Sequence, residues 1–158
     1  MTRRIITKKE PRNCLRTDRA HRQIKARKYL AVVDKSFCCW AYPFNLIERI
    51  DKLIHAGEIL RDDDTCCVSR VLWNDKNAVV RKYDHKGLVY SLFRTPMGSR
   101  ARRDWFNAHR LEKPDIAAPR PPAYIEERRE ILIWKSYFVN EYIEGQRICD
   151  LLGQSDVT

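Results

Sequence analysis

Residues 58–83 have the sequence EILRDDDTCCVSRVLWNDKNAVVRKY, and this stretch decides the expected fold. It contains three apolar runs, at 58–60, 66–73 and 78–83, which are separated by two short polar turns. Runs of this length between polar turns are typical of β-strands. Because the connections are so short, we expect the three strands to form an antiparallel meander.

Two stretches with helical periodicity flank this meander. Upstream of it, apolar residues at helical spacing predict a helix that Pro43 opens and Gly57 ends. Downstream of it, Ser99 is expected to cap a basic helix that runs to about Glu112, with an apolar stripe on one face. The meander is therefore expected to pack against helices.

The C-terminal part of the chain predicts two further strands. A proline-rich entry leads into the first, near 123–126, and a turn at Arg128 and Arg129 separates it from a long run at 131–143. The long run is apolar at successive positions, so both of its faces are expected to be buried. Helix, three strands, helix and two strands together predict an α+β fold.

The net charge of +10 is concentrated at the N-terminus. Residues 1–30 hold 11 of the 31 Lys and Arg residues but only two of the 21 acidic residues, so the remainder is nearly neutral. We expect a basic flexible arm at 1–28 and an apolar segment with a helix at 29–57. Such an arm could bind an anionic membrane surface or nucleic acid, or act only as a solubilising tail.

The sequence favours a cytosolic protein. No run approaches the ~20 apolar residues that a membrane helix needs, and the N-terminus lacks the apolar stretch of a secretory signal. The six cysteines do not have the spacing of zinc or redox motifs, so we expect buried free thiols and no metal site. The four histidines have no acidic or cysteine partner at ligand spacing and are interpreted as surface or helix residues.

Five segments, in their order and spacing, resemble the lipopolysaccharide kinase (Kdo/WaaP) family, whose members phosphorylate sugars of the lipopolysaccharide inner core. They are AGEILRDDDTCCVSRV (56–71), VVRKYDHKGL (79–88), SRARRDWFNAHRL (99–111), APRPPAYIEERR (118–129) and SYFVNEYIEG (136–145). The resemblance implies a protein-kinase-like small lobe, a five-stranded antiparallel sheet with one packed helix, here preceded by a helix and the basic arm. It assigns 58–145 to this lobe and 146–158 to the start of the linker to a second lobe.

The resemblance also implies ATP with Mg as cofactor. In a kinase lobe, a lysine on the third strand contacts the phosphates and an acid on the helix holds that lysine. Here the strand carries Arg81 and Lys82, and only one of two neighbours can face the cleft. The family order would place Arg81 at the lysine position, but we slightly favour Lys82, because a flexible ammonium group suits phosphate binding better than a planar guanidinium. A solvated pair on an edge is the alternative.

Asp104 is the best-placed helix acid, one turn before Ala108 on the face expected to pack on the sheet. A local partnership with Arg100 or Arg103 is an equally good interpretation of this aspartate. The expected phosphate-covering loop, between the first two strands, has three aspartates and no glycine, so it is as well explained by a charged turn.

The segment 140–145 resembles the hinge between kinase lobes. Backbone groups of Glu141 and Ile143 would bond the adenine edge, and Gly145 would let the chain turn. No H-x-D or D-F-G string occurs in the chain, although phosphoryl transfer needs these aspartates. The expectation is therefore a truncated member of the family.

In the full-length protein, the expected reaction is ATP-dependent phosphoryl transfer to a lipopolysaccharide core sugar, which this chain alone would not catalyse. We expect a cytoplasmic protein, which the arm could hold at the inner face of the inner membrane. The alternative is a non-enzymatic basic module that binds nucleic acid or a membrane surface.

Overall fold

The computed structural model describes residues 21–35, 46–73, 76–84, 98–112 and 118–145. These residues form seven strands and two helices. In chain order they are β1 (His21–Ala26), β2 (Tyr29–Asp34), α1 (Leu46–Ala56), β3 (Glu58–Asp63), β4 (Cys66–Trp73), β5 (Lys76–Asp84), α3 (Arg100–Glu112), β6 (Ala123–Arg129) and β7 (Leu132–Glu141).

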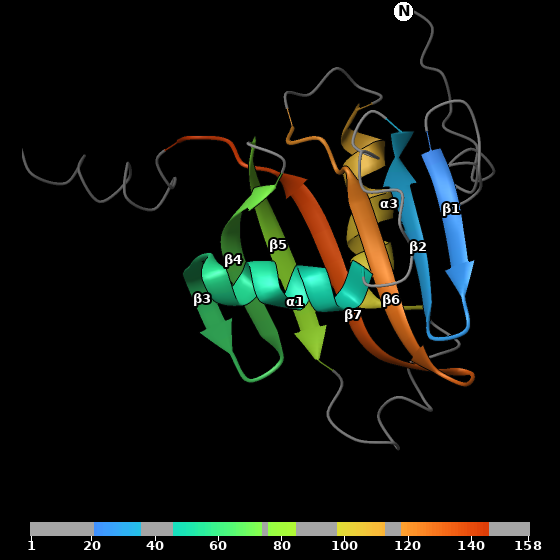
Figure 1. Cartoon of the computed structure of the whole chain (residues 1–158). Coiled ribbons are helices and arrows are strands. Elements are labelled where there is room, and N and C mark those ends of the chain that lie inside the picture. Colours follow the sequence, from blue (N-terminus) through green and yellow to red (C-terminus); the bar gives the residue numbers. More distant parts are fainter. Residues whose placement is uncertain (1–20, 36–45, 74–75, 85–97, 113–117, 146–158) are drawn as a thin grey trace, which may run out of the picture.

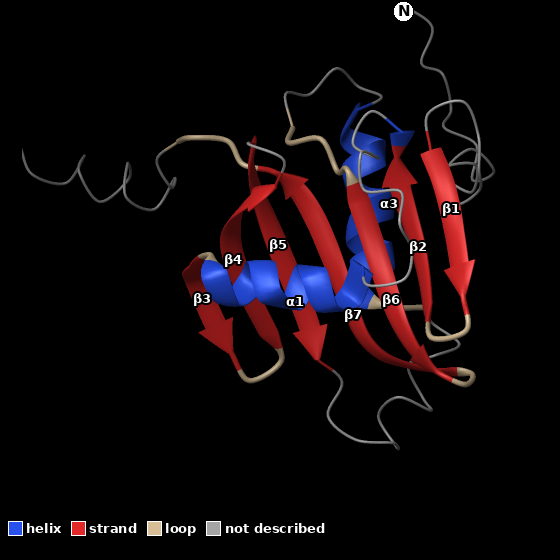
Figure 2. Cartoon of the chain, viewed as in Figure 1, coloured by secondary structure: helices blue, strands red, loops and turns tan. Residues whose placement is uncertain are grey.

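The strands form one antiparallel sheet in the order β1-β2-β6-β7-β5-β4-β3, and the two helices lie on its opposite faces. Helix α1 crosses the near face in Figure 1, and α3 lies behind the sheet; Figure 2 shows the same three layers by secondary structure. Each interface has its own buried cluster. Ile50 and Ile54 of α1 pack in one cluster, and Ala101 and Trp105 of α3 pack in the other.

Local signals in the sequence fix the ends of both helices. The Ser99 hydroxyl accepts a hydrogen bond from the Arg102 backbone N–H at 3.0 Å, which confirms the expected N-cap of α3. Gly57 ends α1 as expected, and it does so where only glycine fits. A Cβ atom at this position would lie 2.5 Å from the carbonyl oxygen of Arg70 on β4.

The α+β class and the antiparallel meander are confirmed, but the expected number of strands is wrong. The sheet has seven strands and not five, because β1 and β2 extend it beyond β6. Residues 21–28 were expected to belong to an arm without strand character. Strand β1 nevertheless covers the outer edge of the apolar β2 and pairs His21 with Asp34. An edge strand buries few side chains, so it needs no apolar alternation.

Four strands have bounds that differ from the expected ones. Strand β5 covers Lys76–Asp84 and not 78–83. Strand β6 continues through Arg129, so the turn lies at Glu130 and Ile131, and Glu130 takes a left-handed φ of 57°. Strand β7 covers Leu132–Glu141 and not 131–143. Strand β3 runs on to Asp63, beyond the expected end at residue 60, because its exposed side chains on both faces tolerate charge.

Two further expectations concern cysteines and membrane segments. Cys66 and Cys67 are free thiols, as expected, but both are only partly buried; the other four cysteines lie outside the described residues. No helix in the described part of the chain is long and apolar enough to span a membrane. The first 20 residues, which form most of the predicted arm, also lie outside the described residues.

Candidate functional site

The two neighbouring cations of β5 point to opposite faces of the sheet. Nη1 of Arg81 lies 4.0 Å from Oδ2 of Asp104 on α3. Nζ of Lys82 lies 3.4 Å from Oδ1 of Asp51 on α1. The alternation of side chains along a strand therefore gives each helix one cation. Of the two candidates for the phosphate contact, only Arg81 shares a face with Asp104.

Asp104 is held in place by its neighbours on the sheet. The Tyr83 hydroxyl donates a hydrogen bond to Oδ2 of Asp104, the same oxygen that faces Arg81. Burial raises the pKa of Tyr83 above its usual value, and the bond to Asp104 raises it further. The adjacent Trp105 is fully buried and anchors the helix. Asp104 can thus orient the Arg81 guanidinium, whose side chain is still 43% exposed.

A hollow of about 210 Å³ opens beside this pair, between α3 and strands β5 and β7. Its walls include Arg81, Asp104, the ring of Phe138 and the side chain of Asn140. The Arg81 guanidinium carbon lies 6.0 Å from the centre of the Phe138 ring. The hollow thus combines a cation, a flat apolar wall and an amide, the combination that holds a charged planar ligand.

Asn140, one of the residues that line this hollow, carries a buried acceptor without a hydrogen-bond partner. Its side chain is buried, with 9% of the residue exposed. Its Nδ2 donates to the carbonyl oxygen of Glu141 at 3.1 Å, whereas Oδ1 has no hydrogen-bond partner. A buried polar atom without a partner costs about 1–3 kcal/mol. A ligand would recover this cost if the Asn140 side chain turned its buried Oδ1 into the hollow and the ligand donated a hydrogen bond to it.

The predicted hinge positions follow Asn140 directly. The backbone N–H of Glu141 donates to the carbonyl of Arg120 at 2.9 Å, and its carbonyl accepts from Asn140. The side chain of Ile143 is 58% exposed. Both backbone groups of Glu141 are thus bonded within the protein, and an adenine contact at Glu141 or Ile143 stays a prediction.

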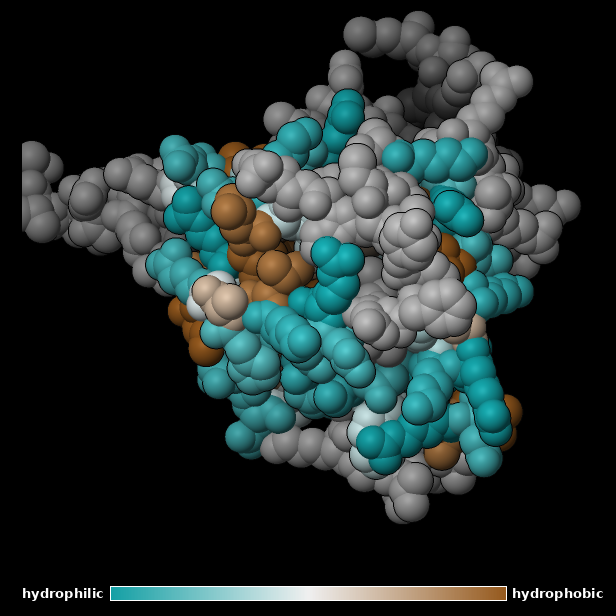
Figure 3. Space-filling model, in the orientation of Figure 1, coloured by the Kyte–Doolittle hydropathy of each residue, from teal (hydrophilic) through white to brown (hydrophobic). Residues whose placement is uncertain are grey.

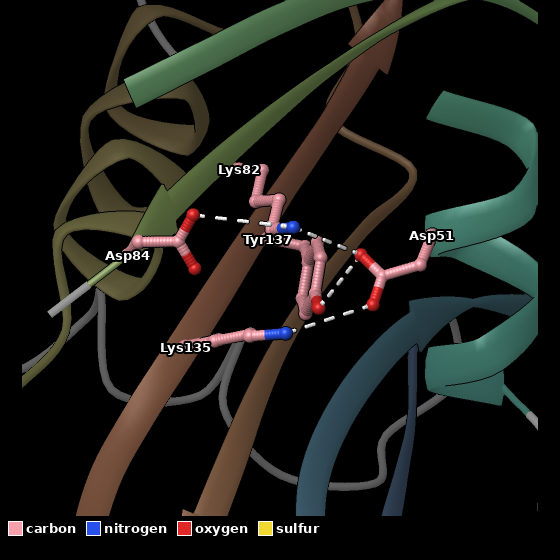
Figure 4. Close-up of polar contacts among 5 residues, drawn as sticks. All are labelled: Asp51, Lys82, Asp84, Lys135 and Tyr137. Carbon is pink, nitrogen blue, oxygen red and sulfur yellow. Dashed lines mark hydrogen bonds and ion pairs between the residues drawn. The ribbon is translucent and has the colours of Figure 1, made fainter. Parts of the chain in front are cut away.

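Lys82 belongs to a polar cluster on the α1 face, which Figure 4 shows. Oδ1 of Asp51 accepts from the Tyr137 hydroxyl at 3.1 Å, and Oδ2 lies 3.8 Å from Nζ of Lys135. Nζ of Lys82 lies between Asp51 at 3.4 Å and Asp84 at 3.9 Å. Burial, reinforced by Asp51, raises the pKa of Tyr137. We call these five residues the α1 latch, because they tie α1 to the sheet.

Two local contacts bear on the alternative interpretations of Asp104 and of the β3–β4 turn. Nη1 of Arg100 donates to Oγ1 of Thr65 at 3.4 Å, which joins the start of α3 to the β3–β4 turn. That turn carries an ion pair between Arg61 and Asp63, so part of its charge is balanced locally. Within the part of the chain that is described, no three His, Cys, Asp or Glu residues are grouped to hold a metal ion.

Sequence reasoning overlooked Asn140 and the contact between His21 and His109. Asn140 lies two residues after Phe138, so the two share a face of β7. An amide that follows the apolar run 137–139 and shares a face with Phe138 was a signal that could have been found. Nε2 of His21 and Nε2 of His109 are 3.1 Å apart, across β1 and α3, and sequence spacing could not indicate this contact.

Comparison with known proteins finds a distant likeness of fold to a solved structure. No family model and no curated protein matches the sequence. Among solved structures, the chain resembles "WaaP in complex with acyl carrier protein" with a TM-score of 0.54 and 17% identity. The match covers 78% of this chain and 45% of that chain, so this chain spans less than half of its structural neighbour. A likeness at this level of identity concerns the fold.

Proposed function

We propose that this chain is a kinase-like small lobe that binds ATP on the α3 face of its sheet. The observation that carries the proposal is the Arg81–Asp104 pair beside a hollow that Asn140 also lines, with its Oδ1 buried and without a hydrogen-bond partner. The fold likeness to WaaP supports a kinase-like interpretation of this face. In the complete protein the reaction would be phosphoryl transfer to a lipopolysaccharide core sugar in the cytoplasm.

Arg81 is the phosphate contact in this proposal. Its guanidinium group has several donors, of which the 4.0 Å contact with Asp104 uses few. Charge-assisted hydrogen bonds from such a group to phosphate oxygens are stronger than neutral ones. Asp104 would position the guanidinium, as the helix acid positions the lysine in kinases. Lys82 instead stabilises the α1 latch.

Asn140 would recognise the base. Adenine presents an exocyclic amino group that donates hydrogen bonds, whereas guanine presents an acceptor oxygen at the equivalent position. Oδ1 of Asn140 is an acceptor without a partner, so it would favour adenine. The ring of Phe138 would support the flat face of the base.

In this proposal, Mg and the chemical step belong to a second lobe. The described residues hold no group of three His, Cys, Asp or Glu side chains that could bind a metal ion. Phosphoryl transfer requires a catalytic-loop aspartate, an asparagine and a metal-binding aspartate. The function that we propose for this chain is therefore the positioning of the nucleotide, and a second lobe would supply the chemistry.

Arg81 and Lys82, which face opposite sides of the sheet, provide the test. ATP affinity would be measured by calorimetry for the wild type, Arg81→Ala and Lys82→Ala. We expect Arg81→Ala to weaken ATP binding about 10- to 100-fold, as the loss of a charged hydrogen bond predicts. Lys82→Ala should leave the affinity within about twofold, although it lowers stability. The wild type should bind ATP more tightly than GTP.

The opposite ranking of the two variants would assign the phosphate contact to Lys82 and contradict the proposed site. Absence of ATP binding by the folded wild type would contradict nucleotide binding itself. Urea unfolding of each variant separates a weakened site from a weakened fold, because the α1 latch affects stability without lining the hollow.

A further inference from the structure

Two hairpin turns lie side by side at one end of the sheet and carry an unusual surface. Strands β2 and β6 pair with Tyr29 opposite Glu127, which brings the β1–β2 turn next to the β6–β7 turn. The backbone N–H of Arg128 donates to the carbonyl of Lys28 at 2.7 Å and joins the two turns. We call this end of the sheet the hairpin end.

The hairpin end is basic. Arg27, Lys28 and Arg129 are exposed, and Arg128 is half-buried against Glu126, whose carboxylate it contacts at 2.7 Å. A recess of about 600 Å³ separates the two turns, and its walls are Arg27, Lys28, Glu127, Arg128, Arg129 and Glu130. Four basic residues against two acidic ones give this recess a positive field, which attracts anions.

An apolar residue projects from the middle of these cations. Ile131 is 78% exposed, the highest value among the exposed large apolar residues of the described chain. The preceding Glu130 holds a left-handed φ of 57°, a conformation that costs energy in a residue other than glycine. Nearby, the Arg129 guanidinium lies 4.2 Å from the centre of the Trp134 ring. In Figure 3, the lower right of the surface combines hydrophilic areas with small hydrophobic ones.

We propose that the hairpin end docks on a phospholipid bilayer that contains anionic headgroups. Cations near such a surface contribute about 1 kcal/mol each, and an apolar side chain at the tip can enter the headgroup region. Tryptophan is enriched at the same depth of a bilayer. A nucleic acid would use the cations but would gain little from an apolar residue that projects into solvent, so the combination favours lipid.

This surface takes Arg27 and Lys28 from the C-terminal end of the predicted arm at 1–28, and it is distinct from the proposed nucleotide site. His21, the first described residue, pairs with Asp34 at the other end of β1 from the β1–β2 turn. Asn140 lies nine residues beyond Ile131, about 30 Å along an extended strand. On a bilayer, the hairpin end would therefore hold the hollow away from the membrane surface. The proposal uses no residue of the hollow.

The test compares two double variants that lose the same charge. The full chain would be sedimented with vesicles of phosphatidylcholine, alone or mixed with an equal part of phosphatidylglycerol. We expect Arg27→Ala/Lys28→Ala to weaken binding to the anionic vesicles about 30-fold. Lys52→Ala/Lys76→Ala, which removes two exposed cations elsewhere, should change it less than about threefold.

The apolar residue is tested separately. Ile131→Ser should weaken vesicle binding about tenfold, and Ile131→Trp should strengthen it. The matched control is Ile59→Ser on β3, a 55% exposed isoleucine outside the hairpin end, which should have no effect.

Three outcomes would overturn the proposal. They are equal losses in the two double variants, equal binding to neutral and anionic vesicles, and no response to either substitution of Ile131. Competition by duplex DNA in the absence of an Ile131 effect would identify the surface as a nucleic-acid site instead.

Discussion

The two faces of the sheet place a cation of β5 near a helix aspartate in two different environments. On the α1 face, Lys82 lies 3.4 Å from Asp51 and its side chain is only 17% exposed. On the α3 face, Arg81 lies 4.0 Å from Asp104, its side chain is 43% exposed, and a hollow opens beside it.

The partners of the two aspartates explain the difference. Asp51 faces three donors, the side chains of Lys82, Lys135 and Tyr137, so its lone pairs are used within the protein. Asp104 has the Tyr83 hydroxyl and a more distant guanidinium, which keeps donors for another anion. A pair that satisfies itself contributes to the fold, whereas a pair with spare donors is available to a ligand.

The largest expected effect comes from the truncation of Trp105, which packs α3 on the sheet. Trp105 is fully buried, so Trp105→Ala should lower the free energy of unfolding by about 3–5 kcal/mol. On the other face, Ile50→Ala should cost about 2–5 kcal/mol. Urea unfolding measures both losses. A change below about 1 kcal/mol in Trp105→Ala would contradict the packing of α3 on the sheet.

A second test separates the two aspartates. Asp51→Ala leaves two lysine ammonium groups and a buried hydroxyl without their common acceptor, so we expect a loss of about 1–3 kcal/mol of unfolding free energy. Its ATP affinity should not change. Asp104→Ala should weaken ATP binding, because Arg81 loses its orientation. Unfolding in urea and calorimetry with ATP, on both variants, would reveal any reversal of these effects.

A third test uses alkaline pH. Burial raises the pKa of Tyr137 and of Tyr83 above the usual 10.0, so both hydroxyls stay protonated in the folded protein where the unfolded chain ionises. The ionisation of these two hydroxyls should therefore leave the free energy of unfolding unchanged below pH 10 and lower it above pH 10. Tyr137→Phe should reduce that fall more than Tyr83→Phe, because Tyr137 is the more buried. Thermal unfolding between neutral and alkaline pH measures the difference, and parallel curves for Tyr137→Phe and the wild type would contradict it.

The sequence predicted the elements whose ends carry a local signal. The N-cap at Ser99 and the glycine that ends α1 at Gly57 are signals of a few adjacent residues, so the two helices could be placed without tertiary information. Strand β1 could not be placed, because an edge strand has little burial to leave a pattern. Residues 21–26 form a strand because the apolar β2 needs a hydrogen-bonding partner on each side.

The candidate site was predicted in composition but not in orientation. Alternation showed that only one of Arg81 and Lys82 faces the cleft, yet which one depends on where α3 packs. Asp104 was identified, and its partner among the cations was not. Lys82 lies near Asp51 of α1 and so has a structural role. The type of residue alone does not distinguish this role from phosphate binding.

The smallest expected effect concerns Cys66 and Cys67. These neighbours on β4 also face the two opposite sides of the sheet. Cys66 packs with the α3 cluster and Cys67 with the α1 cluster. Burial raises the pKa of both thiols, while Arg81 opposes the increase at Cys66 and Lys82 opposes it at Cys67. Both thiols should therefore react slowly with iodoacetamide at pH 8, and faster as the pH rises, since the thiolate is the reactive form.

ATP should act on only one of these two thiols. Phosphates bound at Arg81 would cancel the charge that favours the Cys66 thiolate, so its pKa would rise further and its alkylation would slow a few-fold. The cation near Cys67 is Lys82, on the other face, so its rate should not change. The rate at which residue 66 or 67 is alkylated, followed by peptide mass spectrometry in Cys67→Ser and Cys66→Ser with and without ATP, assigns the effect to one thiol. An equal slowing of both would mean that ATP stabilises the whole sheet without binding at Arg81.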